Sequence, residues 1–201
     1  RFRSVVLKNY LCIIMENKLK LYMIMLGCIP DGRLIEQHDI FFGIGTSLKD
    51  LLPDILAYWP ESKGQIHIDA WREVTKVDGF SIEVVERSAA TSSGQHLFFL
   101  NLGGYKKNEF EEYHYKVLGV APTLATAIKR SKETAFYKHF GFRGAPSHID
   151  EKYGIDVDNA FKVEDILGPH LKEYYQLKIT ENVLKKDDKL HIGYVTISKL
   201  N

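Results

Sequence analysis

Short runs of apolar residues, rich in β-branched and aromatic side chains, alternate along the chain with polar connections and predict β-strands. The first run covers residues 21–26 and ends at Gly27, where glycine suits a sharp exit from a strand. A second run covers residues 34–44. Only a polar connection separates the two runs, so a hairpin is their simplest pairing. Residues 97–102 and 110–120 show the same two patterns later in the chain.

A helix is predicted after each of these strand pairs. In the first helix, six apolar residues recur at helical spacing and fall on one face: Leu48, Leu51, Leu52, Ile55, Leu56 and Trp59. Thr46 and Ser47 supply N-cap hydroxyls, and Pro53 inside the pattern predicts a kink or a late start. The second helix is expected from about Leu124 to Phe140, with Thr123 as its N-cap.

A further hairpin is predicted after the first helix. Residues 65–77 and 80–85 flank Asp78-Gly79, a dipeptide that favours a tight hairpin turn. The corresponding turn in the second half of the chain is expected at Asp158-Asn159, which also tolerates turn geometry.

The second half of the chain repeats the first. A shift of 76 positions aligns identical residues without a gap: Leu21 with Leu97, Leu26-Gly27 with Leu102-Gly103, Glu36 with Glu112, His38 with His114, Gly43 with Gly119 and Leu48 with Leu124. After an insertion, a shift of 81 positions aligns His67-Ile68-Asp69 with His148-Ile149-Asp150, Phe80 with Phe161 and Glu83 with Glu164. Order and spacing are kept in both stretches, which predicts an internal duplication.

The order of elements predicts an α+β fold, built as a tandem duplication of a ββαββ unit. We expect a largely antiparallel sheet with helices on one face and a pseudo-two-fold relation between the units. The first repeat is assigned to residues 20–87 and the second to 95–167, joined by a linker at 87–94 that is rich in Ser and Ala.

The two ends of the chain have no counterpart in the repeat. Residues 168–201 are expected to form a C-terminal β-hairpin from Lys172–Thr180 and Leu190–Leu200. Residues 1–19 form an N-terminal extension, and we expect Met15, just ahead of the first repeat, to be the natural start.

Composition and charge narrow the class of protein. The chain has 201 residues, 45% of them hydrophobic, which is enough to bury a core. A net charge of +1 removes the broad attraction to nucleic acid or to an anionic membrane, so neither partner is expected. Cys12 and Cys28 show neither disulfide nor zinc spacing and are expected to be free thiols in a cytoplasmic protein. Exposed edge strands could pair between chains as a homodimer.

Two pairs of chemically active residues recur in both repeats. Glu-x-His occurs at Glu36/His38 and Glu112/His114, and His-x-Asp occurs at His67/Asp69 and His148/Asp150. Residues two apart in a strand point to the same face, so each pair can place a carboxylate beside an imidazole. If the strands are neighbours, each repeat gathers two histidines and two carboxylates. Such a group could hold a divalent metal or act as a general acid/base pair.

A purely structural role is the alternative for these pairs. The Glu could orient the His by a hydrogen bond and the Asp could cap a turn, so that both pairs only tie strands together. Internal repetition would preserve such a tie as readily as a site. A phosphate site at Gly43-Ile44-Gly45 is disfavoured because the second copy has Pro122 there, which removes an N–H donor.

Part of the sequence resembles a known family. The segments Leu26-Gly27, Ile35 through Phe42, His67-Ile68-Asp69-Ala70-Trp71 and Val77-Asp78-Gly79-Phe80 resemble family 1543 of the domains of unknown function, a bacterial family. The resemblance covers both repeats and implies a bacterial, two-copy member. It implies no activity, cofactor or catalytic residue.

The sequence contains no complete catalytic constellation, since neither a GxSxG motif nor a Cys in a nucleophile context occurs. It therefore favours a non-enzymatic protein that binds a small ligand or another protein through the duplicated unit. The alternative is a metal-assisted or acid/base enzyme that uses the Glu-x-His and His-x-Asp pairs. Neither the ligand nor a cofactor follows from the sequence.

Overall fold

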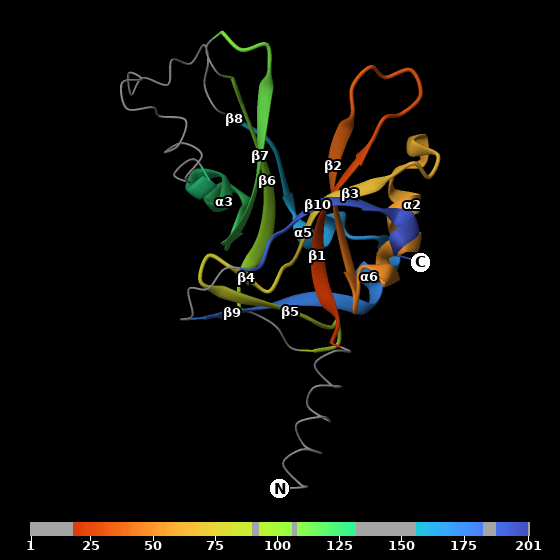
Figure 1. Ribbon diagram of the computed structural model, residues 1–201. Helices are drawn as coiled ribbons and strands as arrows, with labels where there is room; N and C mark the ends of the chain where they lie inside the picture. The colour runs from red at the N-terminus through yellow and green to blue at the C-terminus, as the bar shows by residue number, and fades with distance from the viewer. Residues whose placement is uncertain (1–17, 90–92, 106–107, 132–155, 183–187, 201) are drawn as a thin grey trace, which may run out of the picture.

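The computed structural model describes residues 18–89, 93–105, 108–131, 156–182 and 188–200. These residues form a mixed α/β fold with three antiparallel sheets and few helices (Figure 1). The first sheet has the order β10-β3-β1-β2, the second β4-β5-β9 and the third β7-β6-β8. The strands are β1 (Lys20–Cys28), β2 (Gln37–Gly45), β3 (His67–Glu73), β4 (Lys76–Val77), β5 (Phe80–Glu86), β6 (His96–Tyr105), β7 (Glu112–Ala121), β8 (Asp156–Lys162), β9 (Tyr175–Glu181) and β10 (His191–Thr196). The antiparallel pairing is confirmed, but it is divided among three sheets.

The helices are short. A 3-10 turn, η1 (Lys49–Leu51), leads into α2 (Leu52–Tyr58), and Pro53 lies in the first turn of α2, so the late start is confirmed. Helix α3 (Leu124–Ser131) begins where predicted, and residues 132–140 of the expected helix lie outside the described residues. The remaining helical turns are η2 (Pro60–Ser62), α5 (Val163–Ile166), α6 (Pro169–Tyr174) and η3 (Ile197–Lys199).

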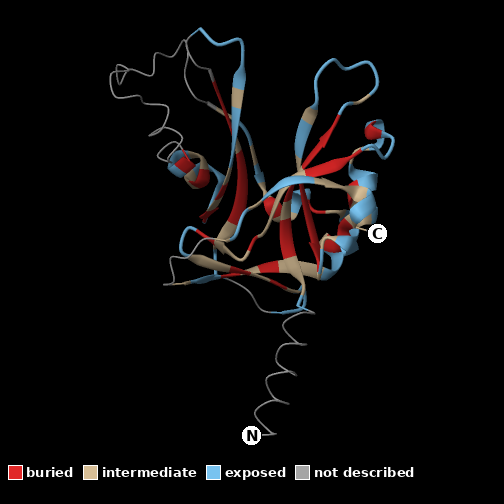
Figure 2. Cartoon of the chain, viewed as in Figure 1, coloured by how far each residue is buried: buried red, intermediate tan, exposed pale blue. Residues whose placement is uncertain are grey.

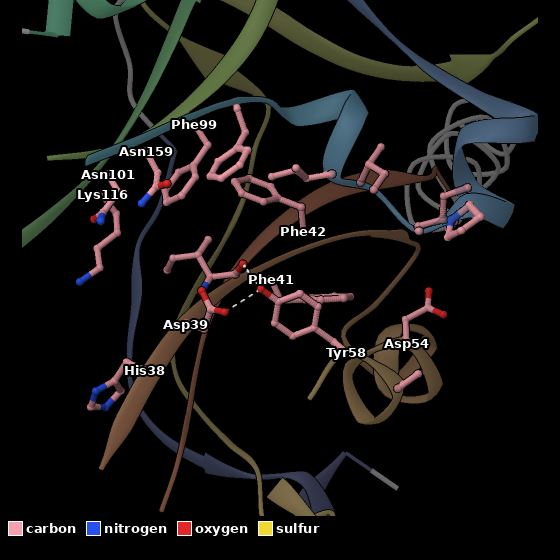
Figure 3. A pocket seen from close by; sticks show the side chains of 18 of the residues that line it. His38, Asp39, Phe41, Phe42, Asp54, Tyr58, Phe99, Asn101, Lys116 and Asn159 are labelled. Atoms are coloured by element: carbon pink, nitrogen blue, oxygen red, sulfur yellow. Dashed lines mark hydrogen bonds between the residues drawn. The ribbon is translucent and has the colours of Figure 1, made fainter. Parts of the chain in front are cut away.

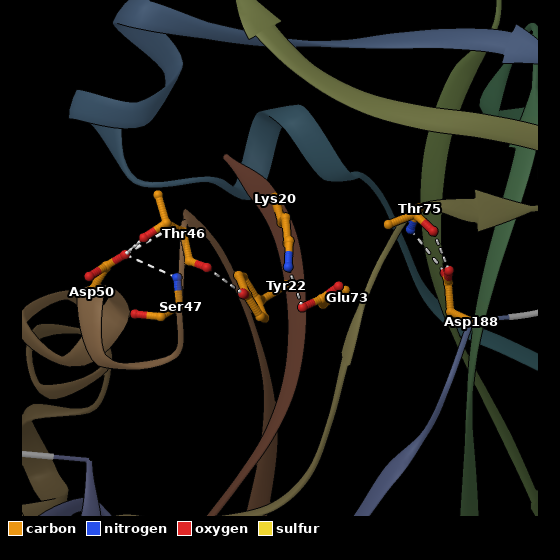
Figure 4. Close-up of polar contacts among 8 residues, drawn as sticks. All are labelled: Lys20, Tyr22, Thr46, Ser47, Asp50, Glu73, Thr75 and Asp188. Carbon is orange, nitrogen blue, oxygen red and sulfur yellow. Dashed lines mark hydrogen bonds and ion pairs between the residues drawn. The ribbon is translucent and has the colours of Figure 1, made fainter. Parts of the chain in front are cut away.

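The predicted N-caps are confirmed in one helix and wrong in the other. Thr123 Oγ1 accepts a hydrogen bond from the Thr126 N–H at 3.2 Å, as an N-cap does. Thr46 and Ser47 do not cap through their hydroxyls. Their N–H groups donate instead to the Asp50 carboxylate, at 2.8 and 3.0 Å (Figure 4). Because a side-chain carboxylate occupies these donors, no free phosphate cradle follows strand β2.

Two of the sheets share one pairing register. His38 lies opposite Gly27 in the β1–β2 pair, and His114 lies opposite Gly103 in the β6–β7 pair. The pairing of β1 with β3 shifts register between Met25 and Leu26, and that of β6 with β8 shifts at the equivalent place, Asn101/Leu102. The extra residue lies in the partner strand, Asp69 in β3 and Asp158 in β8, opposite the same point of both central strands.

Successive side chains of a strand point to opposite faces, so the buried residues (Figure 2) divide between one core shared by the sheets and outer cores beneath the helices. The inward faces of the first and third sheets share one core with the second sheet, which crosses beneath them, and Phe42 meets Phe99 there with ring centroids 5.6 Å apart. The outer face of the first sheet packs on η1 and α2 through residues such as Leu51 and Ile55. That of the third sheet packs near α3 through Ala127. The far ends of the β1–β2 and β6–β7 hairpins extend beyond these cores and are exposed.

The hairpin at Asp78-Gly79 is confirmed, since both residues have positive φ angles, 52° and 81°, between β4 and β5. The turn expected at Asp158-Asn159 is wrong because both residues lie inside β8. Asp158 occupies the bulge opposite Asn101/Leu102. Asp and Asn tolerate a bulge for the same reason that they tolerate a turn.

The C-terminal hairpin is also wrong. Strand β9 pairs with β5 over seven residues, and β10 pairs with the edge of β3, so the two strands join different sheets. Burial explains why the two strands join different sheets. Leu177 and Ile179 of β9 enter the shared core, and His191 of β10 stacks on Trp71 with ring centroids 3.8 Å apart.

Two carboxylates, the buried one of Asp188 and that of the exposed Asp78, tie the C-terminal segment and the two halves together. Asp188 accepts hydrogen bonds from the N–H groups of Thr75 and Lys76 at 3.0 and 3.1 Å (Figure 4 shows the Thr75 contact). Asp78, at the β4–β5 turn, accepts a hydrogen bond at 2.9 Å from the Val120 N–H of β7. Among the described residues, no helix has the length and apolar character needed to cross a membrane.

Candidate metal centre

The four side chains predicted for the first repeat converge at one place. His38 Nε2 lies 3.5 Å from Glu36 Oε2 and 3.2 Å from Asp69 Oδ2. His67 Nε2 lies 2.9 Å from Glu36 Oε1 and 3.4 Å from Asp69 Oδ2. The two imidazoles and two carboxylates thus alternate around a small common space. We call these four residues the first cluster.

Local structure explains the convergence. Glu36 immediately precedes β2 and His38 lies within it, so the two side chains share a face. His67 begins β3, across β1 from His38, and Gly27 of β1 lies between them. A Cβ atom on Gly27 would lie 2.5 Å from His67 Nε2 and 2.6 Å from Asp69 Oδ2. Because Gly27 has no side chain, the His67 and Asp69 side chains have room to lie close together.

The first cluster contains polar atoms that have no partner in the described part of the chain. His67 Nε2 and Asp69 Oδ2 are buried and lack a hydrogen-bond partner among the described residues. The His67 side chain is 9% exposed. No Lys or Arg in the described part of the chain pairs with Glu36 or Asp69 at salt-bridge distance. Buried unpaired polar atoms are costly, so this arrangement is expected where a further group completes the site.

Two neighbouring groups shape the surroundings of the cluster. The Tyr194 ring of β10 lies on the His67 imidazole, with centroids 4.4 Å apart, so the C-terminal strand covers one side of the site. Cys28, at the end of β1, is a buried free thiol. Its pKa is raised by burial and further by the negative charges of Glu36 and Glu61. The thiol thus stays protonated beside the carboxylate-rich site.

A second cluster occupies the equivalent place in the third sheet. Glu112, His114 and Asp158 each offer one ligand atom, and these atoms all lie within 4.8 Å of one another. His114 Nε2 is 3.4 Å from Asp158 Oδ2. Gly103 leaves the space, because a Cβ there would lie 2.3 Å from Asp158 Oδ2. All three ligand residues are exposed, so this cluster is more open than the first.

Asp158, which sequence reasoning did not select, lies beside His114. His148 and Asp150, expected beside Glu112 and His114, lie outside the described residues. The position of β3 is taken by β8, where Gly103 pairs with Asp156 as Gly27 pairs with His67. A signal was present: Asp156-Val157-Asp158 has the polar, apolar, acidic order of His67-Ile68-Asp69. Tyr194 had no such signal, because its contact with His67 joins distant parts of the chain.

Each cluster contributes one histidine to the lining of a cleft of about 880 Å³. His38 lines it from β2 and His114 from β7, and aromatic residues, including Phe42 and Phe99, line its base (Figure 3 shows His38, Phe42 and Phe99). The Tyr58 hydroxyl donates to Asp39 Oδ2 at 2.9 Å on the same wall as His38. Burial, with the charge of Asp39, raises the pKa of Tyr58, which keeps this hydroxyl a donor.

The geometry of the first cluster suits a divalent metal ion. Ligand atoms bound at about 2.0–2.2 Å to one ion lie roughly 3–3.5 Å apart in tetrahedral or octahedral sites. The four His–carboxylate separations, 2.9 to 3.5 Å, fall in or close to this range. Among the described residues, the three ligand atoms that all lie within 4.8 Å of one another are those of the second cluster. Imidazole nitrogen and carboxylate oxygen suit zinc and other first-row divalent ions, whereas Ca²⁺ and Mg²⁺ favour oxygen ligands alone.

Comparison with known proteins adds a family and a fold. None of the curated proteins compared matches the sequence. The described fold is similar to the crystal structure of a protein, Il1583, from Idiomarina loihiensis, with a TM-score of 0.57, 22% sequence identity, and coverage of 88% of this chain and 95% of that one. This likeness concerns the fold alone. The model of the family described as Domain of Unknown Function (DUF1543) matches residues 33–84, the segment that carries all four residues of the first cluster, and so supports the family resemblance found in the sequence.

Proposed function

We propose that this protein binds a divalent first-row metal ion, with zinc as the reference ion, through Glu36, His38, His67 and Asp69. The observation that carries the proposal is the buried His67 Nε2, which has no hydrogen-bond partner among the described residues and faces two carboxylates, one of which also contacts His38 at 3.2 Å. Metal binding would satisfy this atom and offset the repulsion between the two carboxylates. The ligand-binding role expected from the sequence thereby gains a specific ligand.

A structural tie explains the cluster less well. A tie requires hydrogen bonds between the partners, yet the 2.9 Å contact between His67 and Glu36 lacks hydrogen-bond geometry. A bound ion holds ligand atoms close together without hydrogen bonds between them, which agrees with the short separations in the first cluster.

Titration calorimetry of the chelator-treated full chain with Zn²⁺ and Mn²⁺ tests the proposal. The test variants are Glu36→Gln and His38→Ala. Both side chains are 39% exposed, so the protein should fold with either substitution. His170→Ala is the matched control. It removes a histidine that also contacts a carboxylate, Asp54, at 3.1 Å, but lies outside both clusters.

We expect one tight equivalent per chain, weakened at least about tenfold in both test variants and unchanged in the control. Affinity should also fall as the pH is lowered, because ligands must be deprotonated to bind. Absence of tight binding, or equal losses in the control and test variants, would show that the cluster is only a structural tie.

We also propose that the two halves are diverged copies of one unit and that the second cluster is a weaker metal site. The shared register of β1–β2 and β6–β7 and the shared bulge position support a common origin. Three exposed ligands, Glu112, His114 and Asp158, support weaker binding than the four of the first cluster. His114→Ala should remove a second, low-affinity equivalent in the same titration and leave the first intact. Loss of the tight equivalent in this variant would contradict the assignment.

A metal-assisted enzyme is the second candidate, because His38 belongs both to the first cluster and to the wall of the cleft. An ion held there could polarise a ligand in the cleft or activate a water molecule. Hydrolysis of p-nitrophenyl acetate gives a simple test. Turnover that requires added Zn²⁺ and is lost in His38→Ala would support this candidate, and equal rates with and without metal would remove it.

A further inference from the structure

We propose that the cleft between the first and third sheets binds a small apolar carboxylate, whose anionic group is held by Lys116 and whose apolar body packs on the aromatic base. The proposal does not depend on metal binding. It rests on the asymmetric distribution of charge around the cleft and on apolar side chains that remain exposed inside it.

Lys116 supplies a cation without a carboxylate partner. Its Nζ donates to the His114 carbonyl oxygen at 3.0 Å, and no carboxylate in the described part of the chain lies within salt-bridge distance of it. An ammonium group has three donors, so two remain for a ligand.

Side-chain amides extend this polar end of the cleft. Asn101 and Asn159 lie beside Lys116 (Figure 3), and both line the cleft. Asn101 Nδ2 is 3.4 Å from Asp158 Oδ2, a long contact that leaves it able to turn toward a ligand. An ammonium flanked by amides matches the several acceptor positions of a carboxylate.

The acidic groups of the cleft are engaged on the opposite wall. Asp39 accepts a hydrogen bond from Tyr58 at 2.9 Å, and Asp54 contacts His170 at 3.1 Å. A carboxylate placed near either would meet a negative charge and no lysine. At Lys116 it would meet an ammonium group, and the nearby Asp158 carboxylate is already in contact with Asn101 and His114. The charges therefore orient a ligand with its anionic group toward β7.

The body of the ligand is expected to be apolar. Phe42 and Phe99 form the base, and two apolar residues that line the cleft remain partly exposed, Phe161 at 41% and Ile166 at 38%. Covering such surface is favourable at about 25 cal/mol per Å². A volume of about 880 Å³ lies within the range of small-molecule sites, about 300–1,000 Å³.

A matched pair of probes tests the proposal: 1-naphthoate, an aromatic carboxylate, and 1-naphthamide, its neutral analogue. Binding to the full chain is followed by calorimetry in the presence of a chelator, so that metal sites play no part. Lys116→Met removes the charge and keeps an apolar stem. Lys129→Met, on α3 and outside the cleft, is the control for total charge.

We expect 1-naphthoate to bind one site and to lose about tenfold in affinity in Lys116→Met, with no change in Lys129→Met. 1-Naphthamide should bind more weakly and respond to neither charge substitution, while Phe161→Ala should weaken both probes. The proposal is overturned if 1-naphthoate shows no saturable binding at millimolar concentration, or if Lys116→Met affects the two probes equally. A negative result with 1-naphthoate would not change the expected result of the zinc titration, and a negative zinc titration would not change the expected binding of 1-naphthoate.

Discussion

His67 Nε2 lies 2.9 Å from Glu36 Oε1, yet the two atoms do not form a hydrogen bond. Glu36 comes from the segment before β2 and His67 from the start of β3, and Gly27 of β1 separates the two strands. The contact therefore depends on the central strand having no side chain at this point. This dependence gives the first prediction.

Gly27→Ala should weaken metal binding at the first cluster without unfolding the protein. The new methyl group would lie 2.5 Å from His67 Nε2, in the space where the ligand atoms meet, and would push the imidazole aside. Zinc titration should show at least about a tenfold loss of affinity. Gly103→Ala is the matched control, because it places a methyl group against Asp158 in the second cluster. Identical effects of the two variants on the tight equivalent would contradict the prediction.

Asp188→Asn should destabilise the fold. The Asp188 side chain is 6% exposed and accepts hydrogen bonds from the N–H groups of Thr75 and Lys76, and an amide NH₂ would face some of these donors. We expect the free energy of unfolding in urea to fall by about 1–3 kcal/mol. Asp31→Asn, at an exposed pair with Lys63, is the control and should change it by less than about 0.5 kcal/mol. If Asp188→Asn lowers the free energy of unfolding no more than Asp31→Asn does, the Asp188 hydrogen bonds do not stabilise the fold.

Asp50 should make stability depend on pH in the acid range. Hydrogen bonds from Thr46 and Ser47 hold the pKa of Asp50 below its usual value of 3.8. The stabilisation is thus fully present above that usual value and is lost as the pH falls through the lower pKa of the folded state. Urea unfolding from pH 6 to pH 2 should show a difference between wild type and Asp50→Asn that shrinks toward pH 2. A difference independent of pH would exclude this source of stability.

Cys28 should resist alkylation in the folded protein. The thiol is 1% exposed, and burial raises its pKa, so the reactive thiolate is scarce near pH 7 and out of reach. Peptide-resolved mass spectrometry after iodoacetamide treatment should find Cys28 unmodified in buffer and modified in urea. Rapid labelling in buffer would indicate that the end of β1 opens.

Local pattern was sufficient for several parts of the fold. The β1–β2 and β6–β7 hairpins, the Asp78-Gly79 turn and the late start of α2 all follow from residues close together in the sequence. The Glu-x-His and His-x-Asp pairs were found in the same way, since alternation in a strand fixes which side chains share a face. That these two pairs meet across Gly27 follows from β3 and β2 pairing with the same strand.

Pairing between distant segments was beyond the reach of local pattern. The apolar alternation of β9 marks a strand but does not say that its partner is β5. In the same way, strand pairing places Asp158 at the position of Asp69 in the sheet, whereas His148-Ile149-Asp150, which repeats the sequence of the first copy, lies outside the described residues. The cleft depends on both sheets at once, so no single segment could predict it.

The position of β10 has a consequence for how the protein is made. This strand follows β1, β2 and β3 by most of the length of the chain, yet its Tyr194 ring covers His67 and its backbone completes the first sheet. During synthesis, the open edge of β3 therefore stays unpaired and the His67 imidazole stays uncovered until β10 has been made. Contacts of such long sequence separation form slowly. The proposed metal site should therefore form only after β10 has emerged from the ribosome, and a chain truncated before it should be prone to pairing at the open edge of β3.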